Sequence, residues 1–331
     1  MYTETAPVVL KNGEKVSAGI VVCPDSEWAP RLKRLLGHKP LPYTRQISEL
    51  LTRDTGVDTR FFILHREGIP FANIMTAERS GSGFFGHVWT DQADRKKGAS
   101  SEIMKMVLRD FEDRKSGALF LGTGFDTVAY HFYRKYGFEP LMPGSGSMVL
   151  YADGPEKFDK AYFTDAGTRI VDFGWPHWPA SAALFAGDYP GCVRCAGEKI
   201  FGRQITEGPF LKLLYRIFPE SGKKEHPVPA VVLENTETGA MTGFASHTRH
   251  PLWPRTTVVD LYCHPRFWNR AGELLNALVL PDAARILAYA DEECPEKILT
   301  LESAGFRKTT MLGNMLSIGE SATDILVFEK Q

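Results

Sequence analysis

The sequence predicts two α/β (α+β) domains of similar size, and three observations lead to this prediction. The chain has 331 residues, more than one ordinary hydrophobic core needs, so two domains of roughly 150 residues are expected. Short apolar runs alternate with segments in which apolar residues recur every three or four positions, the patterns of strands and helices. Gly137-Phe138 and Gly305-Phe306 each close a helical segment, about half a chain apart, which indicates duplication of one fold.

The first elements of the N-terminal half alternate between strand and helix. An apolar strand is expected at 18–22, and helices that stop at Gly37 and Gly56 are expected at 27–36 and 45–51. Three strands follow, the first two joined by a hairpin turn at Glu67-Gly68: 61–64, 71–75 and 84–90.

The next segment, 100–114, has the amphipathic pattern of a long helix. Gly117 is expected to end this helix, and a buried strand follows at 118–121. Asp126 is expected to cap a second helix, which ends at Tyr136-Gly137. A return strand at 147–151 completes the half, and a domain boundary near residue 160 divides the chain into domains 1–160 and 161–331.

The second half repeats this order more loosely. A hairpin is expected across Glu237-Thr238-Gly239, between strands at 230–233 and 242–246. The remaining expected elements alternate again, as strand, helix, strand and helix: 256–263, 270–280, 285–289 and 295–304.

Composition excludes several classes of protein. With 39 basic and 40 acidic residues the net charge is -1, without the basic excess typical of nucleic-acid binding. No apolar stretch reaches the length of a membrane span, and residues 1–16 do not form a signal peptide. The five cysteines are few and irregularly spaced, as in a reducing cytoplasm, and Cys192 and Cys195 lack a second pair of metal ligands. We therefore expect a cytoplasmic protein with no nucleic-acid partner, no membrane partner and no metal.

The most informative segment leads from a strand into the long helix. A helix N-terminus offers unpaired backbone N–H groups and a partial positive charge, which bind anions. Gly98 permits the backbone to bend closely around a ligand because it has no Cβ. A basic run directly before it adds charge-assisted contacts to phosphate. These features predict a diphosphate cradle at six successive residues: Arg95, Lys96, Lys97, Gly98, Ala99 and Ser100.

This segment resembles the acetyl-CoA loop of the GNAT superfamily, in which Arg or Gln precedes two residues, Gly, one residue and then Gly or Ala. Arg95 and Gly98 match the pattern, and Ser100 departs from it, with a hydroxyl that could crowd or cap the turn. The resemblance covers roughly residues 60–141, including the family's next strand and its Tyr-bearing helix: Leu119 to Thr123, Ala129, Tyr133 and Gly137-Phe138.

The resemblance implies two GNAT-like domains, each a mixed, mostly antiparallel twisted sheet flanked by helices. It implies acetyl-CoA as cosubstrate. It also implies that the pantetheine arm pairs with the strand backbone at Val88, Trp89 and Thr90, near a point where the sheet splays to admit the thioester.

Acyl transfer needs an acid for the departing thiolate and a base for the amine. The resemblance places Tyr133 as the acid, four residues before Gly137-Phe138, although packing against CoA or the core is the other interpretation. His87, on the strand before the loop, is a candidate catalytic residue or a packed histidine. Glu78 on the neighbouring strand is a second candidate base.

The second half lacks a comparable loop. Counting from Pro265 puts Glu273, or in the next register Leu274, where a small residue must approach phosphate. Leu301 stands where the first half has Tyr133. We therefore expect a degenerate, non-catalytic GNAT-like domain at 161–331.

Three functions follow from these residues. The first is an N-acyltransferase that moves an acetyl group from acetyl-CoA to an amine of a small molecule or peptide. The second is a non-catalytic acyl-CoA-binding regulator or sensor, and the third is a structural protein in which neither half binds CoA. The sequence identifies neither the acceptor nor the oligomeric state.

Overall fold

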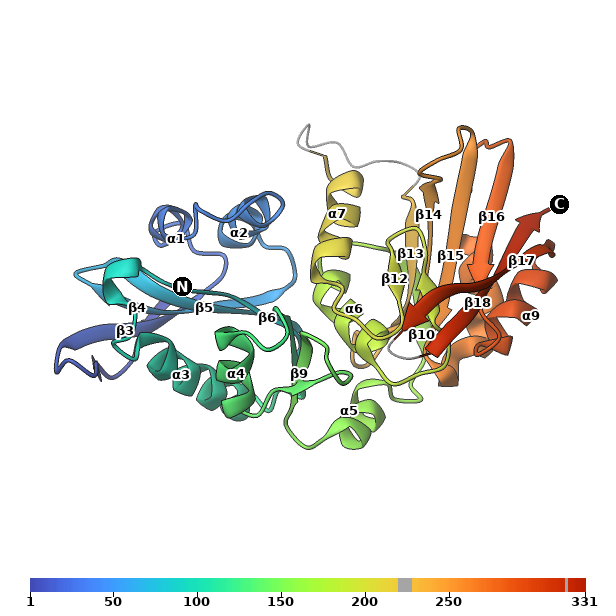
Figure 1. Cartoon of the computed structure of the whole chain (residues 1–331). Helices are drawn as coiled ribbons and strands as arrows, with labels where there is room; N and C mark the ends of the chain where they lie inside the picture. The colour runs from blue at the N-terminus through green and yellow to red at the C-terminus, as the bar shows by residue number, and fades with distance from the viewer. Residues whose placement is uncertain (220–227, 319–320) are drawn as a thin grey trace. The chain divides into compact units, whose positions relative to one another are not determined.

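The protein folds into two compact units, shown in a computed structural model that describes residues 1–219, 228–318 and 321–331 (Figure 1). Met1–Pro140 and Gly146–Phe158 form the first unit, whereas Leu141–Ser145 and Asp159–Gln331 form the second. Each unit has its own sheet, flanked by helices, and its own buried apolar side chains. None of the described helices is both long enough and apolar enough to cross a membrane.

The first unit is built on a sheet whose hydrogen-bonded order is β1-β3-β4-β5-β6-β7-β9-β8, with β2 paired to β3. Its strands are β1 (Tyr2–Glu4), β2 (Val8–Val9), β3 (Lys15–Val22), β4 (Asp58–Arg66), β5 (Ile69–Arg79), β6 (Ser82–Thr90), β7 (Ala118–Gly122), β8 (Glu139–Pro140) and β9 (Ser147–Tyr151). All of its neighbours run antiparallel except β6 and β7, which are parallel.

Helices cover both faces of this sheet. They are α1 (Ala29–Leu35), α2 (Tyr43–Thr52), the 3-10 turn η1 (Gln92–Asp94), α3 (Ala99–Asp113), α4 (Val128–Lys135) and α5 (Pro155–Tyr162), in which the chain passes to the second unit. Figure 1 shows α1 and α2 on one face and α3 and α4 on the other. On the α3 face, Ile103, Met104 and Val107 pack on Phe62 and Phe85 of the sheet, all at most 1% exposed. Each such side chain contributes about 1.5–3 kcal/mol when removed from water.

The second unit contains a seven-stranded sheet in the order β10-β13-β14-β15-β16-β18-β17, and a separate two-stranded hairpin of β11 and β12. The strands are β10 (Thr168–Asp172), β11 (Val193–Cys195), β12 (Ile200–Phe201), β13 (Ala230–Asn235), β14 (Met241–Arg249), β15 (Thr256–Cys263), β16 (Arg285–Ala290), β17 (Phe306–Ile318) and β18 (Ser321–Lys330). The helices are α6 (His177–Ala186), α7 (Glu207–Ile217), η2 (Pro265–Arg270), α8 (Ala271–Ala277) and α9 (Pro295–Ser303).

The two large sheets have the same strand order. The sequence β3-β4-β5-β6-β7-β9-β8 corresponds strand for strand to β10-β13-β14-β15-β16-β18-β17, and β15 and β16 are parallel as β6 and β7 are. Gly137 and Gly305 both take positive φ after the corresponding helices, α4 and α9. Mixed, mostly antiparallel sheets flanked by helices are therefore confirmed as the fold class.

Two local sequence predictions are wrong. Thr127, not Asp126, caps α4, because the Thr127 hydroxyl accepts a hydrogen bond from the Tyr130 amide at 3.2 Å while Asp126 pairs with His131. Helix α3 ends before Gly117, at a turn in which Lys115 takes a left-handed conformation.

Several elements of the second unit were not predicted from sequence, among them α7, β18 and the long elements β17 and α6. Strand β17 is exposed at every position from Arg307 to Met315, so its residues show no alternation of apolar and polar side chains. Helix α6 is buried on all sides, so it lacks an amphipathic period. Phe173, which precedes α6, packs inside this unit against Phe210 and Phe244.

Candidate functional site

The first feature of the site is an open strand edge. Strand β6 pairs with β5 along its length as far as Thr90, opposite Ala72, but its pairing with β7 ends at Phe84 opposite Phe120. The stretch 85–90 therefore has no strand partner on the β7 side within the described residues. An open edge of this kind can accept an extended ligand through main-chain hydrogen bonds. Val88, Trp89 and Thr90, the residues predicted for this role, lie on it.

A β-bulge reshapes the open edge. The register between β5 and β6 shifts between Asn73 and Met75, and His87, within the bulged stretch, takes a left-handed φ of 50°. The Asn73 side-chain amide donates to the His87 carbonyl at 2.9 Å and holds this geometry. A bulge bends its strand and redirects backbone and side chains, which commonly happens beside binding sites.

The loop after β6 ends in a group of free backbone amides. Gly98 is the N-cap of α3 at φ 88°, and Lys96 also has a positive φ of 64°. Within the described residues, the amides of 96–100 donate to no protein acceptor. Five successive free N–H groups at the start of a fifteen-residue helix form an anion site.

The conformation of Gly98 favours glycine, and the Lys11 side chain lies close to it. A Cβ at this position would lie 3.1 Å from Cγ of Lys11, closer than side chains normally approach. The Lys11 amide also donates to the Lys97 carbonyl at 2.9 Å, so this distant segment braces the turn. Lys11 adds a basic residue that the sequence analysis missed, because only the pairing of β2 with β3 brings it to the loop.

The basic side chains of the loop differ in their environments. Arg95 donates from Nε to the Thr90 carbonyl at 3.2 Å and lies over the Trp89 ring at 4.8 Å. Lys96 is exposed, and its side chain makes no hydrogen bond or ion pair within the described part of the chain. Lys97 forms an ion pair with Asp94 at 2.8 Å, so its amide, more than its ammonium group, is free for a ligand.

An ion network fixes the loop to the sheet. Arg66 at the end of β4 donates to both oxygens of Asp94, at 2.7 and 3.1 Å, and to both oxygens of Glu14, at 2.6 and 3.0 Å. The hydrogen bond from Arg66 lowers the pKa of Asp94, and Lys97 lowers it further. The network thus joins the β2–β3 turn, β4 and the loop.

Ser100 occupies the position where the family pattern has Gly or Ala. Its hydroxyl lies 3.1 Å from the Thr90 hydroxyl, and the N-terminus of α3 has no side-chain cap. The extra oxygen is therefore hydrogen-bonded to the end of β6.

Tyr133 lies on α4, beside the point where β6 and β7 separate. Its ring meets Phe85, the first residue of β6 after the last β7 pair, edge to face at 5.5 Å. Tyr133 is 8% exposed, and its hydroxyl has no hydrogen-bond partner among the described residues. Burial raises the pKa of Tyr133 to about 12, so the hydroxyl keeps its proton at neutral pH.

The parallel pair that separates, the loop before α3 and the Tyr-bearing α4 have the arrangement that the sequence resemblance implies. Matching solved structures include an N-acetyltransferase from Staphylococcus aureus Mu50. This match has 16% sequence identity and a TM-score of 0.38, and it covers 50% of this chain and 98% of that chain.

Two further matches contain acetyl-CoA. One is a putative acetyltransferase from Salmonella typhimurium (17% identity, 50% of this chain, 93% of that chain, TM-score 0.38). The other is a GNAT superfamily phosphinothricin acetyltransferase from Sinorhizobium meliloti (13% identity, 49% of this chain, 87% of that chain, TM-score 0.37). No protein-family model and no curated protein matches the chain.

His87 is buried on the α2 face of the first unit. Its Nε2 lies 2.9 Å from Oε1 of Gln46, and its ring meets Tyr43 edge to face. Burial, with smaller effects of Lys39 and His38, lowers the pKa of His87 to about 3. This environment keeps the imidazole neutral and favours the packing interpretation of His87.

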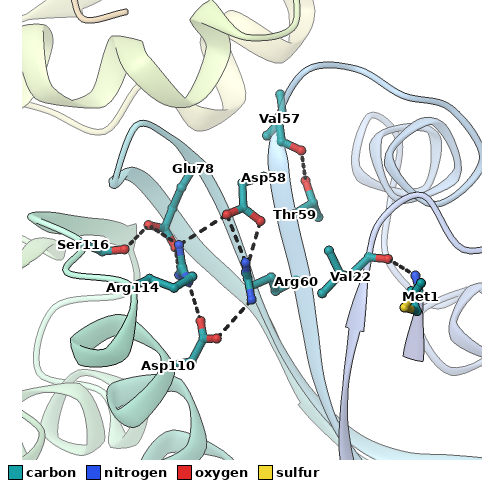
Figure 2. Close-up of polar contacts among 10 residues, drawn as sticks. All are labelled: Met1, Val22, Val57, Asp58, Thr59, Arg60, Glu78, Asp110, Arg114 and Ser116. Carbon is teal, nitrogen blue, oxygen red and sulfur yellow. Dashed lines mark hydrogen bonds and ion pairs between the residues drawn. The ribbon is translucent and has the colours of Figure 1, made fainter. Parts of the chain in front are cut away.

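Glu78 is engaged in a second ion network (Figure 2). Arg114 donates to its two carboxylate oxygens at 2.5 and 3.2 Å, and the Ser116 hydroxyl donates to it at 2.8 Å. Glu78 is 1% exposed, and Arg114 also contacts Asp110 at 2.7 Å. These contacts give Glu78 a structural role that ties β5 to the end of α3.

The corresponding loop of the second unit differs in each of these features. The pairing of β14 with β15 runs without a register shift, so β15 has no bulge. Glu273 is in the first turn of α8 and pairs with Arg270 at 2.7 Å. Leu301 is fully buried in α9, in the place of Tyr133. At these positions the described residues do not repeat the features of the loop in the first unit.

Two other features lie outside this site. A polar hollow of about 700 Å³ opens at the β1 edge of the first sheet, lined by Asp25, Trp28 and Arg31. The Asp25 carboxylate accepts a hydrogen bond from the Trp28 amide and pairs with the N-terminal ammonium group.

In the described ranges, no group of three or more His, Cys, Asp or Glu side chains could hold a metal ion.

Proposed function

We propose that this protein is an N-acyltransferase that moves an acetyl or longer acyl group from acyl-CoA directly to an amine. The observation that carries the proposal is the continuity of two binding features in the first unit. The open edge of β6 leads into the five free amides of 96–100. One ligand that is extended at one end and anionic at the other would satisfy both.

Acetyl-CoA fits these features. The free amides suit its diphosphate, and the exposed side chains of Arg95, Lys96 and Lys11 would add positive charge around it. The backbone of Val88, Trp89 and Thr90 would hydrogen-bond the pantetheine arm as an added strand. When bound, acetyl-CoA supplies an activated thioester.

In this proposal Tyr133 donates a proton to the departing sulfur. Its raised pKa keeps the hydroxyl protonated, and its contact with Phe85 puts the ring beside the opening between β6 and β7. The acceptor is an amine of a small molecule or peptide, and a cytoplasmic location remains our prediction.

A second candidate function is a non-catalytic acyl-CoA sensor, and one observation favours it. Both residues considered as the base are engaged, His87 with Gln46 and Glu78 with Arg114. In a sensor the cradle would bind acyl-CoA without a proton acceptor for the amine.

Calorimetry with acetyl-CoA on the wild type and on Gly98→Glu tests the proposal. We expect micromolar binding by the wild type, and at least a 100-fold loss in the variant, because the new side chain would strain the turn and place a negative charge against phosphate. No binding by the wild type would disprove both functions. CoA release above the hydrolysis rate with a panel of amines would then separate an enzyme from a sensor.

A further inference from the structure

The second unit has an opening that corresponds to the proposed acyl-CoA site of the first. The parallel pairing of β15 with β16 runs from Thr256 opposite Arg285 to Val259 opposite Ala288, and then stops. Strand β15 continues through Asp260 to Cys263. In the first unit, the corresponding strands β6 and β7 also separate, and there we propose that the thioester enters.

A segment of the chain itself occupies this opening. We call 190–201, which contains β11 and β12, the plug hairpin. On the β16 side, the Val193 amide donates to Oδ2 of Asp291 at 2.6 Å. The Val193 carbonyl accepts from the Lys297 ammonium group, in the first turn of α9, at 2.7 Å.

The plug hairpin is also bound on the β15 side. The amides of Ala196 and Gly197 donate to the two carboxylate oxygens of Asp260 at 2.7 and 2.9 Å. The Tyr262 hydroxyl donates to the Pro190 carbonyl at 2.9 Å. The hairpin therefore spans the opening, with hydrogen bonds to β15, to the residue after β16 and to α9.

The polar groups that hold the plug hairpin are deeply buried. Asp260, Asp291 and Lys297 are each at most 1% exposed, as are Val193 and Cys195 of the hairpin itself. If the hairpin left, these charged side chains would lose hydrogen-bond partners in a low-dielectric interior, which opposes its release. This burial identifies the hairpin as part of the core of this unit.

Gly197 fits this close approach. A Cβ there would lie 2.3 Å from Oγ1 of Thr248 and 2.7 Å from Oδ2 of Asp260. Any larger residue would push the hairpin away from β15.

We infer that the plug hairpin takes the place of a ligand in the second unit, so that each chain binds one acyl-CoA, in the first unit. The single-site part of this inference rests on the proposed function. The occupation of the second opening by the hairpin does not depend on it, and the two parts have separate tests.

Calorimetry on the full chain tests the number of sites. We expect one acetyl-CoA per chain for the wild type and none for Gly98→Glu. Two sites in the wild type, or a site that survives Gly98→Glu, would overturn the inference. If the wild type bound no acetyl-CoA, the proposed function would fail, and hydrogen exchange would still decide the role of the hairpin.

Hydrogen exchange with and without saturating acetyl-CoA tests the plug hairpin. The amides of Val193, Ala196 and Gly197 should exchange at least 100-fold more slowly than an unprotected peptide, with no change on adding acetyl-CoA. Asp260→Asn should speed exchange at Ala196 and Gly197 at least tenfold, whereas the exposed control Asp282→Asn should not. Unprotected amides in the wild type, or amides that acetyl-CoA exposes, would overturn the inference.

Discussion

At the scale of single residues, the site combines one residue of unusual conformation with one of unusual environment. Gly98 has a positive φ and little room for a Cβ, and Tyr133 is a largely buried residue whose hydroxyl has no hydrogen-bond partner in the described part of the chain. Both residues were proposed from sequence, because glycine before a helix and tyrosine before Gly-Phe are visible as residue types. The environments of His87 and Glu78, each engaged with another side chain, were not visible in the sequence.

Tyr133→Phe should lower turnover more than acetyl-CoA affinity. Removing a general acid typically costs about 100-fold or more in kcat, whereas the ring that packs on Phe85 is retained. Steady-state kinetics would measure kcat and the KM for acetyl-CoA separately. Tyr130→Phe on the same helix is the matched control, and an unchanged kcat in Tyr133→Phe would remove Tyr133 from the mechanism.

The raised pKa of Tyr133 predicts the alkaline side of the pH profile. Because the pKa in the folded protein is about 12, the acid form persists, and kcat should not fall between pH 7 and 10 through this group. The same shift contributes stability that is present below the unfolded pKa near 10 and is lost as pH rises through about 12. A pH–rate profile and unfolding at several alkaline pH values would check both expectations.

At the scale of elements, two ion networks perform different tasks. The network of Arg66, Asp94 and Glu14 orients the loop before α3, whereas that of Arg114 and Glu78 joins α3 to the sheet. Both depend on residues far apart in sequence, so neither could be recognised from spacing.

Arg66→Met should weaken the binding of acetyl-CoA without abolishing turnover. The loop would lose the bridge from Asp94 to Glu14, and we expect the KM for acetyl-CoA to rise about tenfold, with kcat within about twofold. Arg53→Met removes an exposed pair with Glu49 and serves as the control. An unchanged KM in Arg66→Met would show that the network does not position the loop.

Glu78→Gln should destabilise the protein and leave catalysis in the folded protein unchanged. Removing one partner of a buried pair costs about 3 kcal/mol, because the Arg114 charge loses its main counterion (Figure 2). Urea unfolding would measure the free energy of unfolding, and kinetics well below the transition would measure kcat. A 100-fold loss of kcat with unchanged stability would instead identify Glu78 as the base.

At the scale of the whole molecule, two sheets with the same strand order differ in their strand pairing and in the segments beside their strand ends. In the first, β6 has an open edge and a bulge and leads into a loop with free amides, whereas in the second β14 and β15 pair in continuous register and Asp260 of β15 binds a hairpin. The features proposed as a site in the first unit are therefore not repeated at the matching strand ends of the second. Function depends on the residues at the strand ends, not on the fold that they share.

Phe244→Ala tests whether the second core contributes to cofactor binding. Phe244 is fully buried against Phe173, Phe185 and Phe210, and its truncation should cost about 3–5 kcal/mol of stability. The affinity of the folded protein for acetyl-CoA should stay within about twofold, because every proposed contact is in the first unit. A tenfold weaker affinity, measured by calorimetry below the melting temperature, would contradict this.

The sequence by itself determined the order of most strands and helices, the duplicated fold, the position of the loop and the identity of its glycine. These features are local. The periodicity of a strand or helix, and the residue types that favour a helix N-terminus, depend on residues close together in sequence. It did not reveal β17, which is exposed on both faces, or α6, which is buried on all sides, because neither has a periodic contrast between apolar and polar side chains.

Only the tertiary structure decided which residues meet. It brought Lys11 and Arg66 to the loop, buried His87 under α2, paired Glu78 with Arg114 and seated the plug hairpin between β15 and α9. These contacts join segments far apart along the chain, and their strength depends on burial and on the spacing of charges. Neither quantity exists until the sheets have formed.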